Sequence, residues 1–409
     1  MAATAAHLVD HVLPDVPYRQ WVLTLPFELR MSAAYDPELC SSLLRSYVHQ
    51  VRRWTLQQAR ALGVERPLWG GLTVTQRFGS DLRLNPHFHT ATPDGVFALN
   101  AAGDSVEFVR VPVPTTEDVA EIVGRVRRYS VRVLRRRGLL DDEAHGGLCE
   151  SVVSADDAAL GQCYGGALTG RAAFGPTAGR PAGRLGRLLR STPPQELGPR
   201  CARSHGFNLH ANVTVRGGDR DGLERLCRYL TRPPISHERL ERLDDDHIGL
   251  QLKRPYSDGT THIALTHFEL IERLCALVPR PGTHRVRYHG VFASASPHRR
   301  LVVPVPPDVG SGDPDGPDSF AGQELGSDSL VSKRRRIRRL LWAELLKRTF
   351  GVDPKECPDC GGQMKMIATI MRADAVIAIL DAQGLPTAAP FIRSCRGPPS
   401  GELFEVWWT

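Results

Sequence analysis

Two strand-like runs joined by a short turn decide most of what this chain can form. Residues 71–76 (GLTVTQ) and 84–90 (LNPHFHT) are separated by the turn-like residues 77–80, and the second run is ended by the proline and glycine of 93–95. Runs of this length, bounded by turn residues, are typical of neighbouring strands. Further strand-like runs cover 21–25 and 207–215, and the second of these alternates apolar and polar residues. We therefore expect a sheet.

Helical patterns lie between these runs. Apolar residues recur at three- and four-residue steps over 37–62, and 116–140 and 217–230 are also predicted to be helical. The helix at 116–140 is rich in arginine, which fits either a solvated face or a face that contacts phosphate. Strands mixed with amphipathic helices predict an α+β fold.

Two segments lack such patterns and suggest how the chain divides. Arginines set among Gly, Ala and Pro predict a flexible insertion at about 165–205, and 304–329 is rich in Pro, Gly, Asp and Ser. The 409 residues allow two or three domains at roughly 100–200 residues each. We expect a first domain over 7–300, a disordered linker over 301–332, and a small domain over 333–409 that holds a basic helix and a Cys-x-x-Cys pair.

Charge and cysteine content narrow the possible functions. The 52 Lys and Arg outnumber the 45 Asp and Glu, and the net charge of +7 favours an acidic polymer as the partner. Nine scattered cysteines do not form a disulfide framework. No apolar run approaches the roughly 20 residues of a membrane span, and the start of the chain lacks signal-peptide order, so we expect a cytoplasmic protein with no membrane partner.

A histidine pair on one strand is the first candidate site. Alternate side chains of a strand point to the same face, so His87 and His89 converge while Phe88 enters the core behind them. Two imidazoles placed in this way can share one metal ion, although two ordinary histidines are the alternative. The turn that ends the strand suggests a position near a sheet edge or mouth. Gln76 on the preceding strand is a candidate third ligand, or a plain strand residue.

Tyr229 is the second candidate. Leu223, Leu226, Cys227 and Leu230 share one face of the helix, and Tyr229 lies just outside it, on the side of Arg225. Pro233 ends the helix directly after the tyrosine. A structural tyrosine at a helix edge is the alternative.

Together the two candidates suggest one reaction. A tyrosine oxygen can attack a phosphodiester in line if a metal withdraws charge from the phosphate oxygens, and the product is a covalent phosphotyrosine. Arginines near the phenol would hold the phosphate; Arg225, Arg228 and Arg232 are the candidates.

Seven short blocks also carry a family resemblance, which runs from about residue 7 to 385. They read VLTLP (22–26), QRFGS (76–80), NPHFH (85–89) with DGVF (94–97), GFNLHA (206–211), CRYLTRPP (227–234), LKRPYSDGTTH (252–262) and RYHGV (287–291). In this order they resemble the HUH-type rolling-circle transposases of the IS ninety-one and insertion-sequence-common-region (ISCR) group.

The resemblance implies an antiparallel sheet flanked by helices, with Mg²⁺ or Mn²⁺ at His87 and His89 and with Tyr229 as the nucleophile that stays joined to a DNA 5′ end. It implies single-stranded DNA at transposon termini and target DNA as partners, in a nucleoid-associated bacterial protein. Members of the group usually carry an amino-terminal zinc-binding segment, and this sequence has no cysteine before Cys40. Arg225 and Pro233 occupy the positions one helical turn from Tyr229, so the single-tyrosine kind is expected.

The end of the chain carries two further candidates. Cys357 and Cys360, followed by glycines, form half of a zinc knuckle, and a metal-free pair is the alternative. Arg334, Arg335 and Arg336 open a basic helix that is a candidate DNA contact, because clustered cations bind phosphates whatever the base sequence.

We therefore predict a transposase that nicks and joins single-stranded DNA through Tyr229. Two alternatives remain open. One is a catalytically inactive DNA-binding protein derived from a transposase, and the other is a zinc-dependent hydrolase that uses the histidine pair to activate water.

Overall fold

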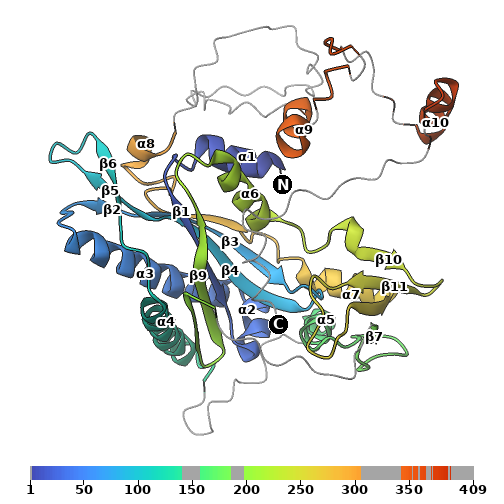
Figure 1. The fold of residues 1–409 in the computed structure, drawn as a ribbon. Helices are drawn as coiled ribbons and strands as arrows, with labels where there is room; N and C mark the ends of the chain where they lie inside the picture. The colour runs from blue at the N-terminus through green and yellow to red at the C-terminus, as the bar shows by residue number, and fades with distance from the viewer. Residues whose placement is uncertain are drawn as a thin grey trace, which may run out of the picture.

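The computed structural model describes residues 2–140, 157–185, 198–304 and 342–387, apart from 352, 358–359, 365–369, 371 and 386. Antiparallel sheets flanked by helices build the fold (Figure 1). This confirms the α+β class predicted from the sequence. The greater part of the linker over 301–332, together with Arg334, Arg335 and Arg336, lies outside the described residues.

A six-stranded sheet forms the centre of the molecule. Its order is β13-β3-β4-β1-β9-β8, and each strand pairs antiparallel with its neighbours. The strands are β1 (Tyr18–Thr24), β3 (Gly70–Phe78), β4 (Leu84–Pro93), β8 (Cys201–Ser204), β9 (Phe207–Val215) and β13 (Val286–Gly290). The strand with both histidines, β4, therefore lies inside the sheet. The expectation of a position near a sheet edge was wrong, because a turn after a strand says nothing about which strands flank it.

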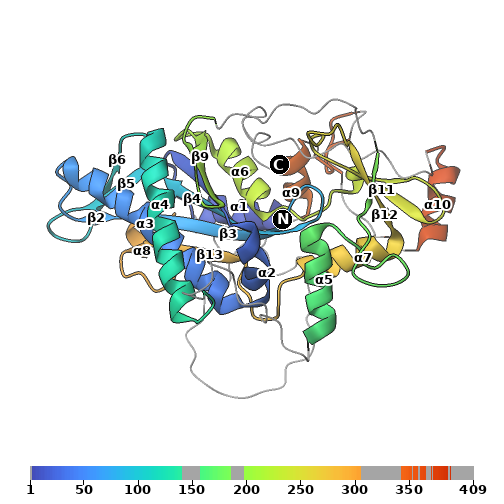
Figure 2. The same cartoon turned by 90° about the horizontal axis from the view of Figure 1, so that it is seen from below.

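Two smaller sheets extend the molecule. One has the order β2-β5-β6 and the other β10-β11-β12-β7. Their strands are β2 (Pro67–Leu68), β5 (Gly95–Leu99), β6 (Val106–Arg110), β7 (Gly183–Leu185), β10 (Leu240–Arg242), β11 (His247–Gln251) and β12 (His262–Thr266). Figure 2 shows β11 and β12, with α5 (Ala158–Thr169) and α7 (His267–Leu277), to one side of the central sheet.

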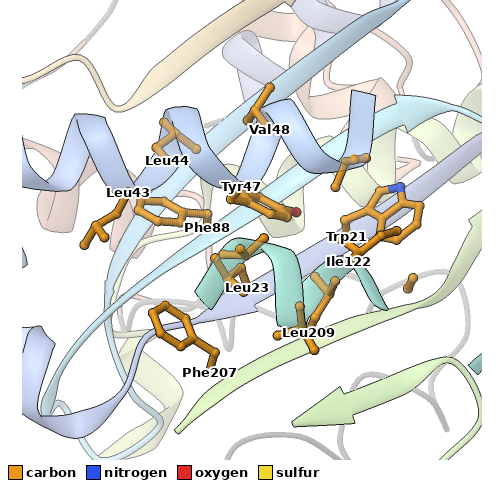
Figure 3. Close-up of a cluster of buried hydrophobic side chains, with 14 of the residues drawn as sticks. Trp21, Leu23, Leu43, Leu44, Tyr47, Val48, Phe88, Ile122, Phe207 and Leu209 are labelled. Carbon is orange, nitrogen blue, oxygen red and sulfur yellow. The ribbon is translucent and has the colours of Figure 1, made fainter. Parts of the chain in front are cut away.

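Two long helices cover one face of the central sheet. Asp36 caps α3 (Pro37–Ala61), and a Thr115–Asp118 capping box begins α4 (Thr116–Arg136). The side chains that point to these helices form a closely packed core, in which the rings of Tyr47 and Phe88 stack 6.2 Å apart (Figure 3). The alternation of β4 thus sends Phe88 into this core and its two histidine neighbours to the opposite face.

The opposite face is covered by α1 (Ala2–His11) and α6 (Arg220–Thr231). The apolar side of α6, formed by Leu223, Leu226, Cys227 and Leu230, packs in this second core as the sequence pattern predicts. Arg220 joins the two helices, because its guanidinium donates to the carbonyl of Val9 on α1 and, at 3.0 Å, to that of Leu13 just beyond it. The remaining helices are α2 (Phe27–Tyr35), α8 (Arg299–Val302), α9 (Trp342–Phe350), α10 (Ala373–Ala382) and the short 3-10 helix η2 (His237–Arg239).

The range predicted to be a flexible insertion, about 165–205, contains more regular structure than its composition suggests. In its described parts, 165–185 and 198–205, α5 ends at Gly170, β7 pairs with β12, and β8 forms the edge of the central sheet. Gly170 adopts a positive φ of 74° at the end of the helix. The strand β7 depends on a distant partner, which local composition does not reveal, whereas β8 pairs with β9, the next strand along the chain.

Helix α9 contacts the two helices that cover the second face of the central sheet, α1 and α6. Arg348 on α9 donates to both carboxylate oxygens of Asp10 on α1, at 2.6 and 2.9 Å, and also bonds Glu224 on α6. Of the helices in the described ranges, none is long and apolar enough to cross a membrane.

Candidate functional site

Two strands and one helix bring the predicted residues together on the α6 face of the central sheet. In the register of the sheet, His87 lies opposite Gln76 of β3, and His89 lies opposite Val74. Tyr229 occupies the last turn of α6 and is half-buried. Its ring centre lies 5.5 Å from that of His89, with the ring planes at 86°. The structure thus brings Gln76, His87, His89 and Tyr229 into one site.

The two imidazoles face each other through the same ring nitrogen. Their Nε2 atoms are 3.0 Å apart, and both side chains are buried, with exposed fractions of 0% and 1%. Nδ1 of His87 lies 2.6 Å from the carbonyl oxygen of Asn85. Since a carbonyl only accepts, this contact holds the proton on Nδ1 and leaves Nε2 of His87 with a lone pair.

Gln20 contacts the outer nitrogen of His89. Its side-chain amide nitrogen lies 2.7 Å from Nδ1 of His89, so Nδ1 accepts in this orientation, and the amide oxygen has no hydrogen-bond partner among the described residues. If the amide is turned over, that oxygen accepts a proton from Nδ1 and His89 also presents a lone pair at Nε2. One amide rotation therefore decides whether both imidazoles can act as ligands through the same atom.

Burial keeps these histidines uncharged. Desolvation lowers the pKa of His87 to about 3 and holds the pKa of His89 well below its usual value. His210, on the same face of β9, has its pKa lowered to about 4 by burial. At neutral pH the pair is therefore neutral, which is the form that binds a metal ion.

Gln76 connects the histidine pair to the helix of Tyr229. Its amide nitrogen donates to the carbonyl oxygens of Leu230 at 2.8 Å and Tyr229 at 3.2 Å, which belong to the last turn of α6. The amide oxygen of Gln76 is buried and has no partner within the described part of the chain. A buried acceptor of this kind is costly unless a cation or a donor satisfies it.

These donors fit a divalent cation. Two neutral imidazoles and one amide oxygen could hold Mg²⁺ or Mn²⁺, which commonly keeps water and phosphate oxygens as its other ligands. In the described ranges, no cluster of three or more His, Cys, Asp and Glu residues could hold a metal ion. Any metal here would consequently depend on Gln76, a residue type outside that set.

Two cations border the phenol ring of Tyr229. The guanidinium carbon of Arg232 lies 4.5 Å from the ring centre, and the ammonium of Lys253 lies 5.9 Å from it. Arg232 follows Thr231, the last residue of α6, and caps the helix in an extended conformation before Pro233. The prediction that the helix ends just after Tyr229 is thus confirmed, and the capping residue places a charge beside the ring.

The structure places the other predicted arginines of α6 beside carboxylates, whereas Arg334, Arg335 and Arg336 lie outside the described residues. Arg225 lies 3.9 Å from Asp219, and Arg228 lies 3.8 Å from Glu224, both within the helix region of α6. Cys357 and Cys360 lie in a tight turn, in which the backbone N–H of Cys357 donates to Gly362 O and that of Gly361 to Cys357 O, each at 2.9 Å.

Sequence reasoning did not single out Gln20 or Lys253. The signal for Gln20 was a polar residue at an inward position of a buried strand, two residues before Val22. Lys253 is exposed and lies in the block 252–262, which the family resemblance contained but to which no role was assigned.

Comparison with known protein families identifies a transposase family. The model of a family described as "Putative transposase" matches residues 70–300, a span that contains Gln76, His87, His89 and Tyr229. No curated protein and no solved structure matches the chain.

Proposed function

The chain belongs to this transposase family, whose model covers more than half of its length, and from that membership we propose a specific reaction. DNA is the partner of such a protein, and cleavage of DNA is its general activity. We propose that this chain nicks and joins single-stranded DNA at element ends, with Tyr229 as the nucleophile, as in the HUH-type transposases of the IS ninety-one and ISCR group. The observation that carries the proposal is the contact between the rings of His89 and Tyr229.

In the proposed step the phenol oxygen of Tyr229 attacks a backbone phosphorus in line. A bond forms between this oxygen and phosphorus, and the bond from phosphorus to the 3′ oxygen breaks. The phenol proton passes to solvent, and the leaving 3′ oxygen takes up a proton to become a free hydroxyl. The 5′ phosphate stays joined to Tyr229, so the bond energy is kept for a later joining step to target DNA.

The residues around the phenol have separate tasks. Arg232 and Lys253 hold the phosphate beside the ring by charge. His87, His89 and Gln76 would hold Mg²⁺ or Mn²⁺, which when bound withdraws charge from the non-bridging phosphate oxygens. Gln76 also keeps the end of α6 at a fixed distance from β3 through its two hydrogen bonds.

The proposal also includes DNA contacts outside the site of Tyr229 and a zinc site near the end of the chain. Arg225, Arg228, Arg334, Arg335 and Arg336 are proposed to contact the DNA backbone, and the net charge of +7 supports such a partner. We further propose that the Cys357–Cys360 turn supplies half of a Zn²⁺ site. Metal analysis of the full chain, compared with a Cys357→Ser, Cys360→Ser variant, tests the zinc site: equal zinc content in the two proteins would contradict it.

The test of the reaction is a denaturing gel. Labelled single-stranded oligonucleotides that tile the DNA flanking the gene are incubated with the protein and Mn²⁺, and covalent adducts appear as protein-sized bands. The wild-type protein and the Tyr129→Phe control should form the adduct, because Tyr129 lies on α4 across the sheet. Tyr229→Phe removes only the nucleophilic oxygen, so it should bind DNA without forming the adduct.

Each of the other outcomes would contradict the proposal in a different way. An undiminished adduct in Tyr229→Phe would refute the assignment of the nucleophile. Binding without an adduct in the wild type would favour an inactive DNA-binding protein. Cleavage that leaves two free ends and does not need Tyr229 would favour a metal-dependent hydrolase.

A further inference from the structure

A cavity of about 280 Å³ lies at the edge of β3, where β13 stops pairing with it. The last backbone contact before the cavity is the N–H of Thr75, which donates to Arg285 O at 3.0 Å. Beyond this point the space beside β3 is closed by the start of α3, the end of α7 and the segment that leads into β13. Its volume is close to the lower limit of roughly 300–1,000 Å³ for small-molecule pockets, which suits one planar ring system better than a large ligand.

Three residues of the cavity lining, Gln76, Pro86 and Pro234, belong to the candidate site or adjoin it in the sequence. Gln76 is the proposed third ligand, Pro86 directly precedes His87, and Pro234 follows the end of the helix that carries Tyr229. A nucleotide next to the phosphate at Tyr229 could therefore reach the cavity.

The walls of the cavity are apolar and cationic. Leu44, Leu277 and Pro279 supply apolar surface, whereas Arg77, Arg285 and Arg287 supply positive charge. Within the described part of the chain, no aspartate or glutamate lines it. Burial raises the pKa of the Cys40 thiol to about 11, so this lining residue adds no negative charge.

Two of the arginines are held in place by the protein. Arg77 donates to the carbonyl oxygens of Ala34 at 2.7 Å and Ala276 at 3.1 Å. Arg287 donates to the hydroxyl of Ser41 at 2.7 Å. Arg285 is exposed at the rim. The cavity thus combines fixed walls with a cation at its mouth.

We propose that this cavity binds one base of the cleaved DNA strand, displaced from its neighbours, at a position next to the phosphate that Tyr229 attacks. The base would lie against the apolar wall, and Arg285 at the rim would contact the adjoining phosphate. The absence of acidic groups from the described lining suits a ligand that brings its own negative charge. This inference rests on the proposed function and adds to it a position at which the enzyme recognises a base.

The experiment compares oligonucleotides that lack a single base. Each position around the nick is replaced in turn by an abasic residue, and binding is measured with full-length Tyr229→Phe protein, so that cleavage does not interfere. The strand that is abasic at one particular position should bind about tenfold more weakly than the intact strand, the order of magnitude expected when one base contact is lost. A protein whose cavity is filled should bind this abasic strand and the intact strand equally well.

Cys40→Phe fills the cavity with an added ring, and Val278→Trp covers its mouth from an exposed position. The second variant keeps the test valid if the first does not fold. Cys275→Phe is the matched control, because it adds the same ring at an exposed position of α7 outside the cavity lining. The Cys275→Phe control should still bind the strand that is abasic at that position more weakly than the intact strand.

Equal binding at every abasic position would overturn the inference, and so would a cavity-filling variant that keeps the tenfold difference. Failure of the proposed function gives a different result. An adduct with no positional effect would contradict only the base pocket, whereas a positional effect without any adduct in the wild type would contradict only the proposed chemistry.

Discussion

His89 and Tyr229 meet edge to face, with ring centres 5.5 Å apart and ring planes at 86°. His89 lies on a strand inside the sheet, and Tyr229 lies on a helix whose apolar side is buried against the same sheet. Gln76 bonds the backbone of that helix directly. The relative position of the two rings is therefore determined by the core of the molecule and not by a loop, which is the arrangement that a pre-organised site requires.

Replacement of the histidine pair should abolish cleavage but preserve DNA binding. In His87→Ala, His89→Ala protein, the proposed metal would lose two of its ligands, whereas Arg232 and Lys253 would remain near the phenol. The adduct gel with Mn²⁺ should show no product for this variant, and oligonucleotide binding should stay within about threefold of wild type, since a charge contact to phosphate needs no metal. Wild-type protein treated with a chelator should behave in the same way. Equal cleavage with and without chelator would argue against a metal at the pair.

Gln76→Leu should weaken both the metal site and the end of α6. The change removes the unpartnered oxygen and the donor to Leu230 O and Tyr229 O. We expect the Mn²⁺ concentration for half-maximal nicking to rise about 10- to 100-fold, as for the loss of groups that support a metal. Loss of the two hydrogen bonds should lower the free energy of unfolding by about 1–3 kcal/mol.

Gln50→Leu is the control for Gln76→Leu. Gln50 is a buried glutamine of α3, and both polar atoms of its side chain have no partner among the described residues. Its replacement by an apolar residue of similar size should leave stability unchanged or raise it. If Gln76→Leu nicks with the same Mn²⁺ dependence as Gln50→Leu, Gln76 is not a ligand.

Stability should fall as the pH is lowered from about 6.5 to 4. Burial lowers the pKa of His289 to about 4, as it does for His210, whereas an unfolded histidine binds its proton near pH 6.5. Between these values the unfolded chain binds more protons than the folded chain. As the pH falls, each such histidine therefore lowers the free energy of unfolding by up to about 1.4 kcal/mol per pH unit. Urea unfolding at several values between about pH 7 and about pH 4 measures the slope of this free energy against pH.

The variant His289→Gln should have a shallower slope in that window. A glutamine can still donate to Thr73, whose hydroxyl lies 2.9 Å from Nε2 of His289, but it does not titrate. An unchanged slope would mean that His289 is not one of the groups responsible.

The sequence was sufficient for features that depend on local pattern. Alternation along β4 predicted that Phe88 and the histidines point to opposite faces, and Pro233 predicted where α6 ends. Both follow from backbone geometry within a few residues. The convergence of His87, His89 and Tyr229 could be expected only by combining two separate motifs with a family resemblance.

What the sequence did not reveal depends on pairing between distant segments. The interior position of β4, the bonds from Gln76 to the end of α6 and the contact of Gln20 with His89 all require the order and register of the sheet. A single sequence does not encode register in a readable form, because many strand pairs with the same alternation are possible. Lys253 was missed for the same reason: it reaches Tyr229 from a loop that follows β11.

The ion pair between Arg19 and Asp94 should be the most sensitive point of the fold outside the site. Both side chains are buried, with exposed fractions of 2% and 4%, and two hydrogen bonds of 2.8 and 3.0 Å join them. Arg19 also donates to Ala211 O at 2.7 Å, which ties β1 and β9 together. Removal of the carboxylate in Asp94→Ala leaves a buried guanidinium without its counter-ion.

We therefore expect Asp94→Ala to lower the free energy of unfolding by about 3–5 kcal/mol, the usual cost of breaking a buried pair from one side. Replacing both partners, as in Arg19→Met with Asp94→Leu, should recover most of that loss, because no charge then remains in the core. Urea unfolding of Arg19→Met, Asp94→Leu and the double variant measures this coupling. If the losses of the single variants simply add in the double variant, the two side chains do not depend on each other, and the stability of this end of the sheet has another source.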